Sequence, residues 1–196
     1  FTHDKYFDLS ISSLRTDLLE IYLISICMFF IGTHSGASNT PLYLFRKPTL
    51  ITNHIPIGNM HTYSDKMLYS FKVQVFKKDN RRLTISEMFE DGWAFTRGDP
   101  KLVGRFPYMF PYNFEIKNVI VKDNSSDEIC SLTLEMLERV ENRWIENAEK
   151  KQLRKEFMSV YLNNLRKYPY LLKYHGEKMK FNIGHEFLKK NYDLIK

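Results

Sequence analysis

The chain has 196 residues, of which 43% are hydrophobic and 15% aromatic, so it carries enough apolar surface for a sizeable core. This composition excludes a disordered polypeptide, and the longest apolar run, residues 18–31, contains Glu20 and is too short to cross a membrane. Cys27 and Cys130 lie in unrelated contexts, which excludes a disulfide framework and favours a reducing, cytoplasmic setting.

The formal net charge of +6 is concentrated near the C-terminus, where residues 150–196 hold 12 Lys and Arg against 4 Asp and Glu. Such an excess is typical of ordinary solvated helices, and it also suits a surface that binds anions or touches a membrane. No nucleic-acid reading motif accompanies the charge, so we expect no nucleic-acid partner.

The first predicted elements are a helix over residues 12–26 and a short strand over Met28–Ile31. The helix has Ser12, Ser13 and Thr16 as N-cap candidates, and its apolar residues recur at helical spacing. The strand is a continuous apolar run that ends at Gly32, the pattern of a strand buried on both faces of a parallel sheet.

A second helix is predicted from Ser38 to Phe45, because Pro41 is best tolerated in a first helical turn. Ser38 is therefore the predicted N-cap. A further strand follows over Thr49–Ile55, and the order helix, strand, helix, strand predicts parallel pairing with a right-handed crossover.

The turn between the first strand and the second helix is a candidate anion site. It contains small and hydroxyl-bearing residues, namely Gly32, Thr33, Ser35, Gly36, Ala37 and Ser38, and residues 32–44 include no carboxylate. A helix N-terminus at the carboxyl edge of a parallel sheet presents free N–H groups and a positive dipole end. We therefore expect this turn to line the main cleft, although a plain strand-to-helix turn also favours Gly and Ser.

Polar residues near this turn are candidate ligand contacts. His34 could contact a diphosphate, transfer a proton, or only stabilise the turn. Asn53 and His54 end the next strand at the same edge, where they would touch a ribose, base or sugar, or simply begin a loop. The spacing of the histidines and carboxylates matches no metal-binding motif, so no metal ligand is predicted.

The rest of the chain is predicted to be mainly structural. Thr84 and Glu87 form a capping box for a helix through Phe89, and Ser125 with Glu128 forms another. Residues 95–114 are rich in Pro, Gly and aromatics and predict an irregular packed segment, with a sugar-stacking platform as the alternative. A strand over Phe114–Val121 precedes long helices that reach Leu165.

A resemblance to known enzymes is carried by three stretches in chain order: DLLEIYL, FFIGTHSGASNTP and FRKPTLITNHIPIG. They resemble the donor-binding half of GT-B glycosyltransferases of the heptosyltransferase-like kind. More narrowly, the chain is similar to a family of bacterial glycosyltransferases with an FxIGxxSGxxxxP core, an LTxxEM segment and a GxxFLxxN ending, here LTISEM (83–88) and GHEFLKKN (184–191). His34 stands where the heptosyltransferases often have Asp.

The resemblance implies a sugar transferase involved in surface-polysaccharide synthesis, with a nucleotide-sugar donor and a glycan or lipid-linked acceptor. Its donor site would comprise Gly32–Ser38, Asn53 and His54, without a metal or another cofactor. The acceptor-binding N-terminal half of such an enzyme is missing from this sequence, so the chain reads as a fragment, inactive alone, whose catalytic base is not identified. Contact with the inner membrane surface, and a non-catalytic nucleotide- or glycan-binding module, stay open as alternatives.

The predicted architecture is therefore α/β, a Rossmann-like three-layer domain with a mainly parallel sheet and C-terminal helices. The nucleotide-sugar-binding domain is expected over residues 1–165. A basic helical tail is expected over residues 166–196.

Overall fold

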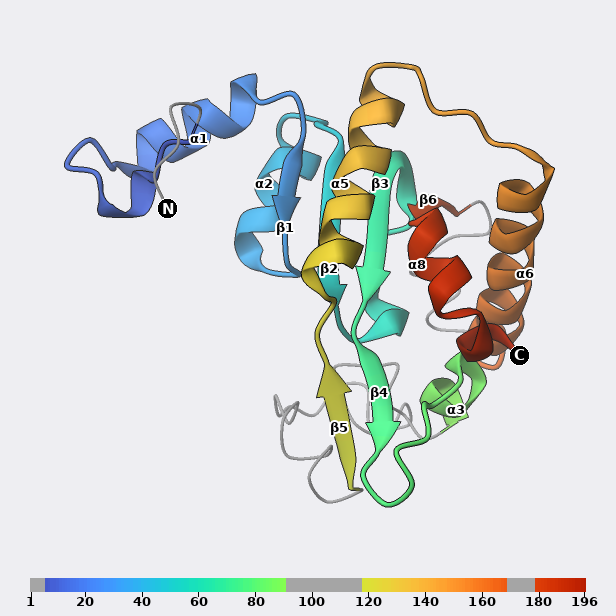
Figure 1. Cartoon of the computed structure of the whole chain (residues 1–196). Coiled ribbons are helices and arrows are strands. Elements are labelled where there is room, and N and C mark those ends of the chain that lie inside the picture. Colours follow the sequence, from blue (N-terminus) through green and yellow to red (C-terminus); the bar gives the residue numbers. More distant parts are fainter. Residues whose placement is uncertain (1–5, 91–117, 169–178) are drawn as a thin grey trace.

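The computed structural model describes residues 6–90, 118–168 and 179–196. Its central feature is a four-stranded sheet in the order β1-β2-β3-β6, and every neighbouring pair is parallel (Figure 1). The strands are β1 (Phe30–Gly32), β2 (Thr49–His54), β3 (Tyr63–Phe71) and β6 (Lys180–Ile183). The predicted α/β class with a mainly parallel sheet is confirmed, as is the parallel pairing of the first two strands.

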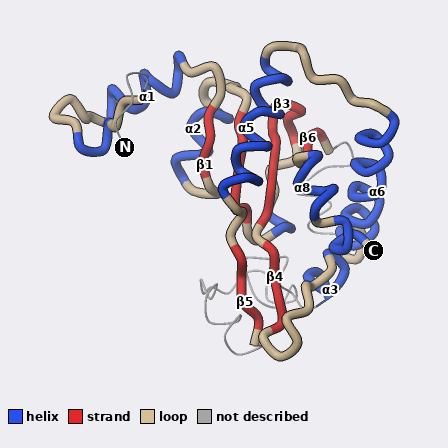
Figure 2. Tube along the Cα trace, in the orientation of Figure 1, coloured by secondary structure: helices blue, strands red, loops and turns tan. Residues whose placement is uncertain are grey.

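A second, two-stranded sheet extends beyond the first. Strand β3 continues through Lys72 into β4 (Val73–Phe76), which pairs antiparallel with β5 (Val119–Lys122). Figure 2 shows this ribbon projecting past the carboxyl ends of the main strands. The sequence predicted a strand near β5 but missed β4, and the segment 95–114, with its proposed sugar platform, lies outside the described residues.

Helices cover both faces of the main sheet, which gives the three layers. The helical elements are η1 (Leu9–Ile11), α1 (Asp17–Ile26), α2 (Gly36–Tyr43), η2 (Ile57–Asn59), α3 (Ile85–Glu90), α5 (Ser126–Val140), α6 (Ala148–Leu165), α8 (His185–Lys190) and η4 (Tyr192–Ile195). Helix α5 lies over one face (Figure 1), while α2 and α6 pack on the other. Within the three described ranges, no helix is both long and apolar enough to span a membrane.

Alternate residues of the strands point into separate cores, as the two-residue period of a strand requires. Leu50 and Leu68 pack against Leu132 and Met136 of α5. The residues between them, such as Ile51 and Tyr69, join a larger core with Leu42 of α2 and with Phe157 and Tyr161 of α6.

Two predicted capping boxes define their helices as expected. Glu128 accepts a hydrogen bond from the backbone of Ser125, and the Ser125 hydroxyl accepts one from Glu128 N. Thr84 and Glu87 make the same reciprocal pair ahead of α3. Of the three N-cap candidates for the first helix, Thr16 is the one used, so α1 begins at Asp17 rather than near Ser12.

The start of α2 differs from the prediction. Its N-cap is Ser35, and Ser38 occupies the third helical position, where its hydroxyl accepts from Ser35 N and donates to Ser35 O. Pro41 therefore lies inside the helix. The helix tolerates it because the carbonyl that loses its bond belongs to Ala37, an exposed residue that water can reach.

The C-terminal segment also differs from the prediction of a purely helical tail. Residues 180–183 form β6, which pairs with β3 and contributes Phe181 and Ile183 to the core. The strand is only four residues long and begins with Lys180 in a basic part of the chain, so the residue pattern did not predict it. The adjoining segment 169–178 is not among the described residues.

One buried side chain joins three elements at the carboxyl edge of the sheet. Asn124 Oδ1 accepts hydrogen bonds from Asn53 N at 2.8 Å and Ser70 Oγ at 2.6 Å, and Asn124 Nδ2 donates to the Phe71 carbonyl at 3.1 Å. In return, Asn124 N donates to Asn53 Oδ1 at 2.6 Å. The end of β2, the end of β3 and the start of α5 are thereby fixed relative to one another.

Replacing this side chain should destabilise the fold. In Asn124→Leu, three buried polar groups lose their partners, so we expect the free energy of unfolding to fall by about 2–4 kcal/mol. Urea denaturation followed by circular dichroism measures it. The control is Asn163→Ala on the exposed face of α6, for which a change within about 0.5 kcal/mol is expected. Equal losses in the two variants would contradict this role of Asn124.

Candidate functional site

The predicted site residues gather at the carboxyl ends of β1 and β2. Because Gly32 lies beside Ile51 in the sheet, the turn after β1 and the last residues of β2 leave the same edge. The structure therefore brings together His34 and His54, which are 20 positions apart in the sequence, with a ring-centroid distance of 4.7 Å. Their predicted proximity is confirmed in geometry.

Further rings that the sequence did not indicate complete a group that we call the carboxyl-edge cluster: His34, Tyr43, His54, His61 and Tyr63. The His61 ring lies 5.7 Å from those of His34, Tyr43 and Tyr63, and Tyr43 stacks at an angle on Tyr63 at 5.4 Å. Tyr43 Oη is 3.3 Å from His61 Nδ1. The cluster thus combines imidazoles with the exposed faces of two tyrosines.

His54 is the most deeply placed member of this cluster. It is fully buried, and within the described part of the chain neither of its ring nitrogens has a hydrogen-bond partner. Burial, with smaller contributions from His34 and His61, lowers the pKa of His54 well below its ordinary value. The nearby Pro56 carbonyl opposes this shift but makes no hydrogen bond to the ring. Because burial dominates and lowers the pKa, His54 is a neutral imidazole at neutral pH.

His34 lies nearer to the surface and is half-buried. Burial also lowers the pKa of His34, while the Ile55 backbone opposes this effect. A neutral imidazole carries one N–H donor and one acceptor nitrogen, so His34 is able to donate to an anion or to accept a proton. Among the described residues, no group of three or more His, Cys, Asp or Glu side chains is arranged to hold a metal ion.

The turn itself is open at its centre. Thr33, Ser35, Gly36 and Ala37 are exposed, and a Cβ added at Gly36 would meet no atom within 4 Å. Backbone N–H groups at this first turn of α2 therefore adjoin space that a ligand could occupy. Gly32 has a different reason to be glycine, because a Cβ there would come within 2.6 Å of the Phe30 ring.

Two of the predicted contact residues are engaged in holding the structure. The Ser38 side chain is buried, and its hydroxyl is used within the capping pair with Ser35. The oxygen of the Asn53 side chain accepts from Asn124 N, and the Asn53 backbone has a positive φ of 53°, a conformation that Asn tolerates. Both side chains therefore stabilise the local structure at the carboxyl edge of the sheet and are not placed as ligand contacts.

A cavity of about 670 Å³ lies elsewhere, towards the amino ends of the strands. It is lined by the start of β3, the C-terminal turn of α5 and the loop after it, through residues that include Lys66, Arg139, Trp144 and Asn182. None of the predicted donor-site residues lines it. The expectation that Gly32–Ser38 line the main cleft is therefore not met by this cavity.

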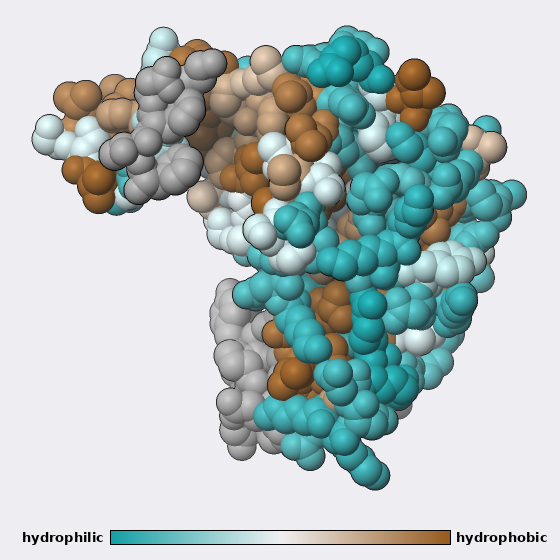
Figure 3. All heavy atoms as spheres, in the orientation of Figure 1, coloured by the Kyte–Doolittle hydropathy of each residue, from teal (hydrophilic) through white to brown (hydrophobic). Residues whose placement is uncertain are grey.

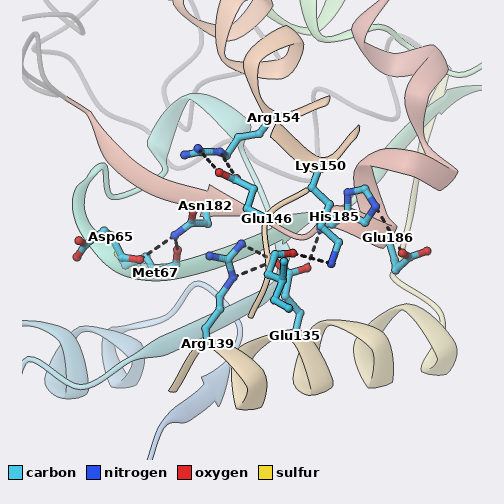
Figure 4. Close-up of polar contacts among 11 residues, drawn as sticks. Asp65, Met67, Glu135, Arg139, Glu146, Lys150, Arg154, Asn182, His185 and Glu186 are labelled. Carbon is cyan, nitrogen blue, oxygen red and sulfur yellow. Dashed lines mark hydrogen bonds and ion pairs between the residues drawn. The ribbon is translucent and has the colours of Figure 1, made fainter. Parts of the chain in front are cut away.

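One charged residue that lines this cavity, Arg139, is paired with a buried carboxylate. Glu135 is buried, and Figure 4 shows how Arg139 and the backbone of His185 converge on its carboxylate. Arg139 donates to Glu135 Oε1 through Nε at 3.0 Å and a terminal nitrogen at 2.7 Å, and His185 N donates to Oε2 at 2.7 Å. Burial raises the pKa of Glu135, and these donors oppose the rise. The group caps α8 and is best explained as structural.

Sequence reasoning missed His61, Tyr43 and Tyr63 as neighbours of the site. His61 and Tyr63 flank the start of β3, a strand that the residue pattern did not reveal. Tyr43 lies at the end of α2, one helical turn beyond the predicted contacts. Tyr63 is the first residue of β3, and Tyr43 is the last residue of α2, so the cluster extends from the carboxyl edge back along the sheet. Recognising these neighbours requires the strand order.

The neutral state of His54 makes stability depend on pH in a defined window. Below its ordinary value of 6.5, the unfolded chain takes up a proton that buried His54 does not, so the free energy of unfolding should fall as the pH decreases. The slope from this residue is at most about 1.4 kcal/mol per pH unit. In His54→Phe, we expect a shallower dependence between about pH 5 and pH 7, measured by urea denaturation.

The matched control is Tyr69→Phe, which alters a ring that contacts His54 but keeps the histidine. This control should retain the pH dependence of the unmodified chain. An unchanged slope in His54→Phe would show that His54 does not control stability in this window.

No family model matches this chain, and no curated protein or solved structure is found to be similar to it. The resemblance to glycosyltransferases therefore remains a prediction from the motifs. What the structure contributes is the fold and the geometry of the carboxyl edge.

Proposed function

We propose that this chain binds a nucleotide-activated sugar at the carboxyl edge of its sheet, as the donor-binding half of a cytoplasmic glycosyltransferase. The observation that supports this most is the β1–α2 turn, where a helix N-terminus and an open space at Gly36 adjoin His54, which is buried and has no hydrogen-bond partner in the described part of the chain. Ligands of open α/β sheets generally bind at this edge.

The diphosphate of the donor suits the turn for electrostatic reasons. The N-terminus of α2 carries the positive end of the helix dipole, and its first turn contains no acidic residue. Gly36 allows close backbone approach, while Thr33, Ser35 and His34 offer hydrogen-bond donors beside it. Negative charge that develops on the departing nucleoside diphosphate would be stabilised by the same groups.

The aromatic part of the cluster suits the rest of the donor. Tyr43 and Tyr63 are 51% and 48% exposed, and aromatic side chains of this kind suit an apolar or planar group such as a nucleobase or the face of a sugar. His61 and His34 lie between these rings and the turn. A nucleoside would therefore extend over the tyrosines while its phosphates lie at α2.

Acceptor binding and deprotonation are assigned to a further domain. Among the described residues, the carboxyl-edge cluster contains no carboxylate that could act as the general base. The pKa values of His34 and His54 are both lowered from the ordinary value for histidine. The acceptor would be a glycan or a lipid-linked saccharide, held together with the donor in one geometry only when both domains are present.

The lack of a carboxylate in the described cluster also favours a second candidate, a non-catalytic module that binds nucleotides or glycans. Calorimetric titration with UDP-, GDP-, CMP- and ADP-sugars tests binding, and transfer of labelled sugar in the presence of the further domain separates the two candidates. Binding with transfer supports the enzyme, and binding without transfer supports the module. Absence of binding to every donor would contradict both nucleotide-based proposals.

A substitution at Gly36 provides the sharpest test of where the phosphates bind. Gly36→Leu should fold normally, since a side chain there meets open space, but it should block approach of the diphosphate. We expect donor affinity to fall by at least about tenfold, or ~1.4 kcal/mol, in calorimetric titrations.

The control is Ser159→Leu, an exposed small-to-large change on α6, which should leave the affinity unchanged. Thermal unfolding of both variants checks that folding is intact. Equal affinity in Gly36→Leu and the unmodified chain would move the phosphate site away from this turn.

A further inference from the structure

The N-terminal part of the described chain forms an arm, residues 6–28, that projects from the domain (Figure 1). Helix α1 within it has no buried residue, although its sequence, DLLEIYLISI, is strongly apolar. Leu18, Ile21, Tyr22 and Ile26 follow helical spacing on one face, and Leu18 is 78% exposed. A helix of this composition is normally covered by other protein.

The exposed apolar surface is concentrated at this end of the molecule. Thirteen of the seventeen exposed large hydrophobic side chains among the described residues lie between Tyr6 and Leu44. Figure 3 shows such side chains gathered on the arm and at its junction with the domain. With exposed fractions between 37% and 84%, these thirteen side chains together expose more than the roughly 800 Å² that each partner contributes to an ordinary stable interface.

The charge pattern indicates what kind of surface would cover them. Residues 21–45 include no Asp, Glu, Lys or Arg, in a chain whose net charge is +6. In a twofold-symmetric dimer the same patch meets itself, so like charges would face one another. The uncharged part of the patch, residues 21–45, avoids that repulsion, and of the four charged residues in the rest of the arm, Arg15 and Glu20 pair with each other.

The edge strand of the main sheet could pair with the same strand of a second copy. Strand β1 is at the edge of the sheet, where the structure pairs it with β2 alone among the described strands, and Ile31 at its centre is 42% exposed. An unpaired edge carries backbone donors and acceptors that a second strand can satisfy. Around a twofold axis, β1 would meet β1 of another copy in antiparallel orientation.

We infer that the arm and the β1 edge form a homodimer interface, in which the two sheets join through their β1 strands and each α1 packs its apolar face against the other copy. This surface includes β1, which leads into the turn before α2, and Tyr43, which also belongs to the carboxyl-edge cluster. The oligomeric state is measured without a nucleotide-sugar, so the outcome of this test is separate from that of the proposed donor site.

The test measures the molar mass of the full chain over a wide concentration range by light scattering and sedimentation equilibrium. We expect a dimer with a dissociation constant of about 10 µM or tighter. The double variant Leu18→Glu, Ile26→Glu should weaken dimerisation by at least about tenfold, because it places charges on the apolar face. Both side chains are exposed, so circular dichroism should be unchanged.

The matched control is Leu134→Glu on α5, which changes a side chain that is 56% exposed but lies outside the arm. It should leave the dimer intact. A second measurement uses Ile31→Cys, which should form a disulfide between copies on mild oxidation, while Leu134→Cys should not. A monomer at all concentrations, an open-ended series of larger species, or equal weakening by Leu134→Glu would overturn the inference.

Discussion

The carboxyl edge of this protein depends on the hydrogen bonds of one buried amide, that of Asn124. Parallel strands do not by themselves fix where their ends lie, because each is connected to the next through a long crossover. Asn124 satisfies a backbone N–H at the end of β2 together with a hydroxyl and a carbonyl at the end of β3. It does so from the residue before the N-cap of α5, so the helix covering one face also fixes the edge.

That framework leaves the two ends of the sheet with different chemistry. Towards the amino ends, the buried carboxylate of Glu135 is satisfied by Arg139 and a backbone N–H. At the carboxyl end, His54 is buried without a hydrogen-bond partner among the described residues, near the N-terminus of α2. A buried polar group without a hydrogen-bond partner costs free energy. A ligand that supplies the missing hydrogen bond removes this cost and gains binding free energy.

The apolar arm adds a constraint of another kind. Burial of hydrophobic surface is the main favourable term in folding, yet α1 contributes almost none to its own domain. The uncharged residues 21–45 run from α1 through the edge strand β1 and α2. The same uncharged part of the chain therefore contributes both to the apolar arm and to the turn at the carboxyl edge.

The sequence by itself determined the features that depend on neighbouring residues. The continuous apolar runs predicted β1 and β2 as parallel strands, but β1 is an edge strand with no buried residue, so the prediction that it is buried on both faces is wrong. The pairs Thr84–Glu87 and Ser125–Glu128 located two helix starts, because a capping box is built within four residues. The same local reasoning misplaced the start of α2, since Ser35 and Ser38 are both plausible caps and the interior proline argued for the wrong one.

Only the tertiary structure decided which strands are neighbours. Strand β6 is the last in the sequence but pairs with β3, and its short run of four residues gives no local sign of that position. His34, His54 and His61 become one cluster because β1 and β2 end at a common edge and the chain returns past it before β3. Sequence spacing carries no information about such contacts, since they are set by burial of the strand faces and by side chains such as Asn124 that hold the strand ends in place.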